Sequence, residues 1–264
     1  MRFSASLLTL CLASICATTA TAADWSNNSL GYRFMPSTAE PDVSDKIIKN
    51  VFNFTHTSGD KLGTNQFSID LLRSNAADPA NGGGGNGAQE WIGFYKRSFS
   101  LKALTGRQDD YGLFKDVRLN ARVDAGTKNT ALAPQPFKGR VGASVALPVA
   151  SGSWDLGLDL YKETNHDGLK KKFVSYDLTP ALTSSWAIPI AGGSVEGFVD
   201  VIGPKGNGTR TEVLLRTSYM YNLADTGLRL GVGIESWRNK SGCNKNIQTH
   251  CTATTSMLLA DYKL

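Results

Sequence analysis

The sequence has few cysteines, few histidines and no long apolar segment beyond its N-terminus. It contains 4 cysteines and 3 histidines among 264 residues. After residue 22, no apolar run approaches the roughly 20 residues that a membrane-spanning helix needs. If the chain crosses a membrane, it must therefore do so as a closed β-barrel, which also satisfies its backbone hydrogen bonds in lipid.

These shortages exclude several classes of function. No cluster of metal ligands and no pair of catalytic carboxylates stands out, so we expect no metal ion and no other cofactor. The formal net charge of +5 is small and scattered. It forms no basic, aromatic-rich patch, and we therefore expect no nucleic-acid partner. The sequence favours a protein that is not an enzyme.

Residues 1–22 have the pattern of a signal peptide. Arg2 provides the positive start, residues 7–15 the apolar core, and Ala20-Thr21-Ala22 the small-residue cleavage site. We therefore divide the chain into a signal peptide, residues 1–22, and one outer-membrane barrel domain, residues 23–264.

Removal of this signal leaves two cysteines, Cys243 and Cys251, in an oxidising compartment. They are eight positions apart, and we predict that they form a disulfide. A zinc site is the weaker interpretation, because His250 is the one further metal ligand nearby.

Alternation of apolar and polar residues predicts β-strands along the whole remaining chain. Residues 47–57 and 64–73, joined by a turn at 58–63, are the clearest hairpin. We expect twelve strands, at residues 25–35, 47–57, 64–73, 90–100, 114–124, 139–148, 153–162, 173–187, 193–202, 209–222, 227–238 and 252–264.

Short and long connections alternate between these strands. Residues 149–152 and 189–192 are short and turn-like, whereas residues 74–89 and 239–251 are long and polar. This alternation is typical of an outer-membrane β-barrel with short periplasmic turns, long extracellular loops and an even number of strands. We therefore expect an all-β, antiparallel transmembrane barrel in the outer membrane of a Gram-negative cell.

The two faces of the predicted strands differ in polarity. In residues 227–238, Leu228, Leu230 and Val232 share one face, and Arg229 and Glu235 occupy the other. Charges at this density do not fit a dry core. We therefore expect a lipid-facing apolar side and a wet lumen.

The predicted lumen is lined by charges of both signs and by aromatic rings. It is mixed and slightly acidic, which disfavours a strongly anion-selective pore. Rings among charges suit flat, polar solutes, and we expect Trp237, Phe198 and Arg229 in particular to contact them. The candidate pore-lining residues are Arg33, Asp70, Arg118, Arg122, Asp159, Tyr161, Glu196, Phe198, Arg216, Arg229, Glu235 and Trp237.

Three stretches resemble the nucleoside-specific channel-forming (Tsx-like) outer-membrane family. They are Phe52-Asn53-Phe54-Thr55-His56-Thr57-Ser58-Gly59, Asn65-Gln66-Phe67-Ser68-Ile69-Asp70-Leu71-Leu72 and Gly87-Ala88-Gln89-Glu90. The resemblance implies a monomeric twelve-stranded barrel with a narrow lumen that passes nucleosides or similar small solutes. No nucleoside-contacting residue of that family can be matched to this sequence position by position.

Two other classes of function stay open. His56-x-Ser58 resembles the histidine and serine pair of outer-membrane phospholipase A, in which the two residues serve as base and nucleophile. A structural or adhesive barrel without transport is the second alternative. The expected partners are a nucleoside-like solute and the surrounding lipid and lipopolysaccharide. Lys170-Lys171-Lys172 is either placed to meet lipid phosphates or a solvated run of charges.

Overall fold

The computed structural model describes residues 23–264 except residues 45, 84 and 169, so the predicted signal peptide lies outside the described residues. No helix in this described part is long and apolar enough to span a membrane. The short helical segments are α2 (Leu101–Thr105), η1 (Ala224–Thr226) and η2 (Lys240–Gly242). The strands are β1 (Trp25–Thr38), β2 (Ile47–Asp60), β3 (Gly63–Ser74), β4 (Gln89–Ser100), β5 (Asp116–Lys128), β6 (Phe137–Ala146), β7 (Ser153–Asp167), β8 (Lys172–Ser175), β9 (Thr179–Ile190), β10 (Gly193–Ile202), β11 (Glu212–Asn222), β12 (Leu228–Arg238) and β13 (Ala253–Lys263).

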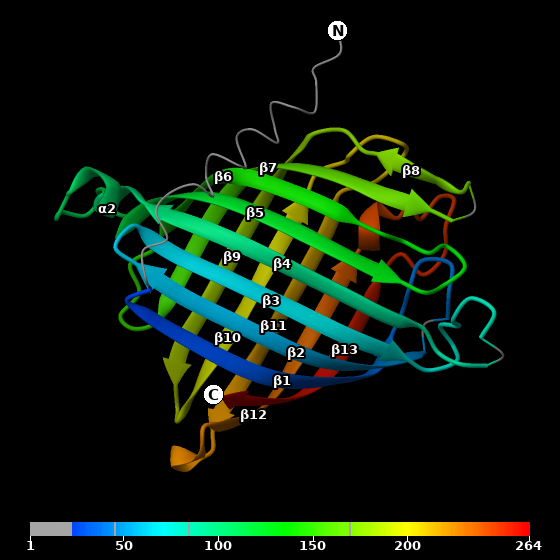
Figure 1. Ribbon diagram of the computed structural model, residues 1–264, viewed down its shortest axis with the longest axis horizontal. Coiled ribbons are helices and arrows are strands. Elements are labelled where there is room, and N and C mark those ends of the chain that lie inside the picture. The colour runs from blue at the N-terminus through cyan, green and yellow to red at the C-terminus, as the bar shows by residue number, and fades with distance from the viewer. Residues whose placement is uncertain (1–22, 45, 84, 169) are drawn as a thin grey trace, which may run out of the picture.

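Antiparallel pairing closes these strands into a barrel (Figure 1). The first strand, β1, pairs with β2 on one side and with the last strand, β13, on the other. The pairing of β6 with β7 completes the ring. Strand β8 pairs with an extension of β7 beyond the ring. Twelve of the thirteen strands therefore form the closed barrel, and the predicted fold class is confirmed.

The two ends of the barrel differ in the length of their connections. One end, here called the short-turn end, carries tight turns at residues 61–62 and 191–192, together with α2 and the start of β1. The opposite, long-loop end carries the loops at 39–46, 75–88 and 239–252, among others. Figure 1 shows the short-turn end at the left and the long-loop end at the right. The predicted alternation of connections is confirmed, with one longer connection, residues 101–115, at the short-turn end.

The expectation of a single strand over residues 173–187 is wrong. That stretch is divided between β8 and β9, with a break at residues 176–178. The backbone N–H of Tyr176 still donates to the carbonyl of Glu163 in β7 at 3.0 Å, but the next N–H, that of Asp177, donates to the carbonyl of Lys205 at 2.8 Å. The pairing with β7 is therefore interrupted at Asp177 by a bond to a loop. A predicted loop at 163–172 is likewise shortened, because residues up to Asp167 extend β7 and pair with β8.

The outer surface of the barrel is an apolar band. Large apolar side chains from eight different strands each expose between 51% and 60% of their surface: Leu30, Phe52, Leu71, Val141, Leu158, Leu182, Val232 and Leu258. A water-soluble protein does not expose so large a continuous apolar surface, whereas a membrane barrel presents it to lipid. The chain is therefore an integral outer-membrane β-barrel.

Most buried residues of the barrel strands lie on the inner face. Met35, Val51 and Met257 form one apolar cluster, and Tyr161, Ala181 and Ile202 form another. Most other buried side chains are polar or charged, including Arg33, Lys49, Arg140 and Glu235. The interior is thus partly filled with side chains and carries the charges that the outer face lacks.

The predicted disulfide is confirmed. Cys243 and Cys251 are bonded, with their Cα atoms 5.3 Å apart, and they close part of the loop between β12 and β13. Both cysteines are buried at the long-loop end.

A charge placed on the outer face should destabilise the barrel in proportion to its depth in the bilayer. Val232 lies near the middle of β12 and is 58% exposed. We expect Val232→Arg to lower the free energy of unfolding by about 2–4 kcal/mol, because the guanidinium would enter the hydrocarbon. Ser236→Arg, two outward positions nearer the rim, should cost about 0–1 kcal/mol. Reversible denaturant unfolding in lipid vesicles measures both, and equal costs would contradict the lipid-facing assignment.

Candidate functional site in the barrel lumen

The strand register places all twelve candidate pore-lining residues on the inner face. Directly paired residues of neighbouring strands face the same side of a sheet, and alternate residues along a strand do so too. From Arg33 on β1, these two rules lead around the ring to the inward positions of every barrel strand. The inward residues include Arg33, Asp70, Arg118, Arg122, Asp159, Tyr161, Glu196, Phe198, Arg216, Arg229, Glu235 and Trp237. Their contact with a solute stays a prediction.

Ion pairs inside the lumen join strands that are not neighbours. Each such pair reaches over one or two intervening strands, which the inward-pointing side chains do through the lumen. The pairs are Arg33 with Asp70 (2.7 Å), Arg140 with Asp200 (3.1 Å), Arg118 with Asp155, and Arg229 with Glu196. Most lumen charges are therefore neutralised locally, and the interior has no strong field of one sign. Asp159 differs, because its Oδ1 has no hydrogen-bond partner within the described part of the chain.

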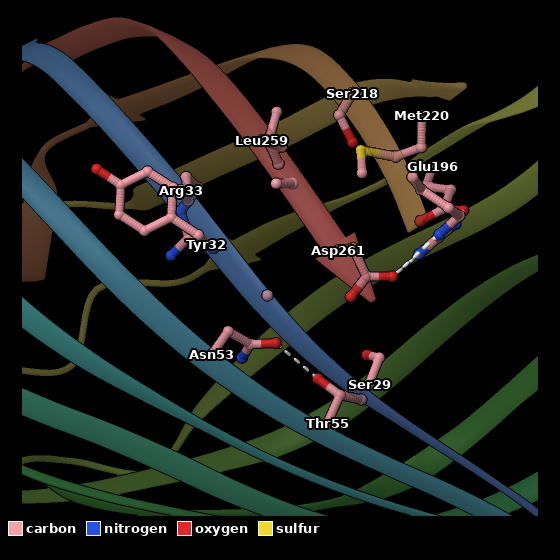
Figure 2. Close-up of a pocket in the computed structure, with 13 residues that line it drawn as sticks. Ser29, Tyr32, Arg33, Asn53, Thr55, Glu196, Ser218, Met220, Leu259 and Asp261 are labelled. Atoms are coloured by element: carbon pink, nitrogen blue, oxygen red, sulfur yellow. Dashed lines mark hydrogen bonds and ion pairs between the residues drawn. The ribbon is translucent and has the colours of Figure 1, made fainter. Parts of the chain in front are cut away.

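A cavity of about 240 Å³ lies among these residues in the half of the lumen nearer the short-turn end (Figure 2). Strands β1, β2, β10, β11, β12 and β13 contribute to its wall. Its lining residues are Ser29, Gly31, Tyr32, Arg33, Asn53, Thr55, Glu196, Ser218, Met220, Arg229, Leu259, Ala260 and Asp261.

The cavity offers hydrogen-bonding groups without an unbalanced charge. Arg229 Nη2 lies 2.6 Å from Asp261 Oδ2, and the same guanidinium also pairs with Glu196. Thr55 Oγ1 donates to Asn53 Oδ1 at 2.9 Å, an interaction drawn in Figure 2. Ser218 adds a hydroxyl on the opposite wall. Such a lining suits a neutral solute with many hydrogen-bonding groups better than an ion.

Trp237, Phe198 and Arg229 do not come together at one site. Arg229 lines the cavity, whereas Trp237 is eight residues further along β12, which is roughly 27 Å at 3.4 Å per residue. The Trp237 ring lies beneath Lys240 at the long-loop end, 5.4 Å from the ammonium. Phe198 stacks with the Arg216 guanidinium, 5.5 Å from its ring centre. One small solute cannot touch all three.

The predicted site residue Tyr161 is fully buried. Its hydroxyl donates to Glu163 Oε2 at 2.6 Å. Lys205, from the loop between β10 and β11, lies 5.7 Å from its ring centre and pairs with Glu163 and, at 3.7 Å, with Glu212. Lys205 thus closes part of the long-loop end above Tyr161. No sequence pattern indicates this role, because Lys205 belongs to a short polar loop.

A second closure at the long-loop end is centred on Glu40. This residue belongs to the loop between β1 and β2, and its Oε1 lies 2.9 Å from Lys240 Nζ and 3.5 Å from Lys128 Nζ. It also pairs with Lys49. The three lysines come from the β12–β13 loop, from β5 and from β2, so loop 39–46 is held across the mouth of the barrel. Lys49 and Lys128 could have been found by extending the inward parity of their strands, but Glu40 could not.

The three ammonium groups keep Glu40 ionised. Burial by itself disfavours the charged carboxylate, but the charges of Lys240, Lys49 and Lys128 outweigh burial and hold the pKa of Glu40 well below its usual range. Nearby, hydrogen bonds from Thr249 and Gln248 lower the pKa of Asp42. Loop 39–46 is therefore tied at two points to the loop that carries the disulfide.

Comparison with known proteins gives a likeness of fold at low similarity. No protein-family model matches the sequence, and no curated protein matches it. Among solved structures, the translocator domain of the autotransporter NalP from Neisseria meningitidis is 10% identical, with a TM-score of 0.43, over 98% of this chain and 95% of that chain. A mutant porin of Rh. blastica is 10% identical, with a TM-score of 0.34, over 91% and 99%. OpdK from Pseudomonas aeruginosa, solved with vanillate, is 8% identical, with a TM-score of 0.28, over 92% and 99%.

Removing the charge of Glu40 should weaken the closure at the mouth. We expect Glu40→Gln to lower the free energy of unfolding by about 3–5 kcal/mol at neutral pH, because three buried lysines lose their common partner. The wild-type advantage is complete above the unfolded-state pKa of a glutamate, about 4.3, and is lost as the pH falls from there through the lowered folded-state pKa. Denaturant unfolding at several pH values measures this difference.

Asp225→Asn is the matched control, since Asp225 is exposed at the short-turn end. It should change stability little at any pH. If Glu40→Gln behaves like this control, loop 39–46 is not held by the lysines.

Proposed function

We propose that this protein is a narrow outer-membrane channel for small, neutral, polar solutes, with nucleosides as the preferred class. The cavity is the main support for this proposal, because paired charges and neutral hydroxyl and amide groups surround about 240 Å³ of space. A nucleoside has the right chemistry for that lining, because its ribose hydroxyls and base edges form hydrogen bonds with groups such as Asn53 and Ser218. Guanidinium planes such as Arg33 and Arg229 can stack on a base.

The proposed solute path through the lumen is narrow. Ion pairs cross the lumen, and the Glu40 and Lys205 clusters constrict its long-loop end. A solute must pass these groups one molecule at a time, so a bound nucleoside should obstruct ions. One copy of the chain encloses the whole lumen, which supports the proposal of a monomeric channel.

Single-channel recording in planar bilayers tests this proposal. Purified protein should form small pores, and nucleosides at millimolar concentration should reduce their current. Ser218→Phe, which fills the cavity, should lower both the conductance and the nucleoside block. Leu230→Phe adds volume to the lipid-facing side of the adjacent strand and should change neither.

Two results would count against the proposal at different levels. If ions are conducted but no nucleoside reduces the current, the proposed nucleoside specificity is wrong and the proposed channel is kept. The absence of any conductance removes the channel itself, and a structural or adhesive role becomes the better account.

One observation favours a second candidate, a lipolytic enzyme. His56 Nδ1 lies 2.8 Å from Asn28 Oδ1, so an amide orients the imidazole, and Ser58 is two residues further along the same outward face. Ser58 is only 5% exposed, and no hydrogen bond joins it to His56 among the described residues. An acyl-release assay on phospholipid vesicles decides: hydrolysis abolished by Ser58→Ala and by His56→Ala would establish the enzyme, and no hydrolysis by the wild type would exclude it.

A further inference from the structure

A second pocket, of about 380 Å³, lies at the long-loop end between the loop at 203–211 and the loop at 239–252. Its lining residues are Arg210, Arg238, Asn239, Lys245, Asn246 and Thr252. We call it the basic pocket. Three of these six residues are cationic, and the other three are neutral hydrogen-bonding residues.

The cations of the basic pocket lack the acidic partners that neutralise the lumen. No carboxylate is among its lining residues, and no ion pair joins Arg210, Arg238 or Lys245 to an acidic residue within the described part of the chain. All three side chains are exposed. Three unpaired positive charges around one pocket repel one another, and a bound anion would relieve this repulsion. Guanidinium groups match the geometry of phosphate oxygens.

The backbone around the basic pocket is held in place by contacts between the two loops. The N–H of Arg210 donates to the carbonyl of Gly242 at 3.0 Å, and Asn239 Nδ2 donates to the carbonyl of Thr211 at 2.8 Å. The disulfide Cys243–Cys251 closes the segment that carries Lys245 and Asn246. The site is therefore organised before any ligand binds, which lowers the entropy lost on binding.

The position of Arg238 indicates the kind of anion. Arg238 ends β12 on the outward face, above the lipid-facing column of Val232, Ile234 and Ser236. Val232 and Ile234 are at least half exposed, so acyl chains lie against them. The guanidinium of Arg238 then stands at the level of the lipid headgroups. A free phosphate ion would use only the upper part of this surface, whereas a phosphorylated lipid would use all of it.

We infer that the basic pocket binds the phosphate of a phosphorylated glycolipid in the membrane leaflet at the long-loop end. Its acyl chains run along the outer faces of β12 and β13. In the orientation typical of outer-membrane barrels, this is the outer leaflet. The site differs from Lys170-Lys171-Lys172, where Lys170 already pairs with Asp167 at 3.3 Å. It is also independent of the proposed channel, because it lies on the outside of the barrel.

Titration of detergent-purified protein with diphosphorylated lipid A, followed by native mass spectrometry, tests the inference. The triple variant Arg210→Gln, Arg238→Gln, Lys245→Gln should bind at least about tenfold more weakly, since charge-assisted hydrogen bonds are lost. The matched control Lys61→Gln, Arg107→Gln, Lys115→Gln removes three exposed cations at the short-turn end and should bind like the wild type. The single variant Lys245→Gln, at an exposed position, should weaken binding without any risk to folding.

Two further measurements distinguish a lipid phosphate from free inorganic phosphate as the ligand. Lipid A stripped of both phosphates should bind as weakly as the triple variant, and inorganic phosphate should displace lipid A only at a large excess. The inference is overturned if the triple variant or the dephosphorylated lipid binds like its unmodified counterpart. It is also overturned if inorganic phosphate alone binds as tightly as the lipid.

Discussion

In the hydrocarbon of a membrane, every backbone N–H and C=O needs a partner within the protein. This chain meets that constraint by pairing β1 with β13, so that none of the twelve barrel strands in the described part of the chain has a free edge. Closure then fixes the direction of every side chain, because the residues of each strand alternate between lipid and lumen. The apolar band outside and the charges inside both follow from this one requirement.

The charges inside the lumen create a second requirement, because an unpaired charge in a narrow, partly desolvated space is costly. Arginines and acids on strands that are two or three apart satisfy each other over the intervening strands, as in Arg33 with Asp70 and Arg140 with Asp200. The interior becomes narrow, polar and nearly neutral. These properties favour small uncharged solutes over ions, which is the basis of the proposed channel.

Much of the fold was predictable, because a period of two residues is a local property. The parity of Leu230, Val232 and Ile234 against Arg229 and Glu235 is visible in the sequence and gives both faces of β12. The disulfide followed from having just two cysteines after the predicted signal peptide.

Features that depend on distant segments were not predictable. Glu40 and Lys205 enter the lumen from loops, and what holds them is a set of charges contributed by other strands and loops. The break between β8 and β9 depends on a backbone bond to Lys205. The separation of Trp237 from Arg229 along β12 required the register, and of these two residues Arg229 alone lines the cavity.

Spin labels placed one at a time along β3 show whether alternate residues of one strand face lipid and a wet lumen. Labels at 67, 69 and 71 should be accessible to molecular oxygen, which partitions into lipid. Labels at 66, 68 and 70 should be accessible to a water-soluble nickel chelate. A strand with equal accessibility to both reagents at every position, or with the opposite alternation, would contradict the account.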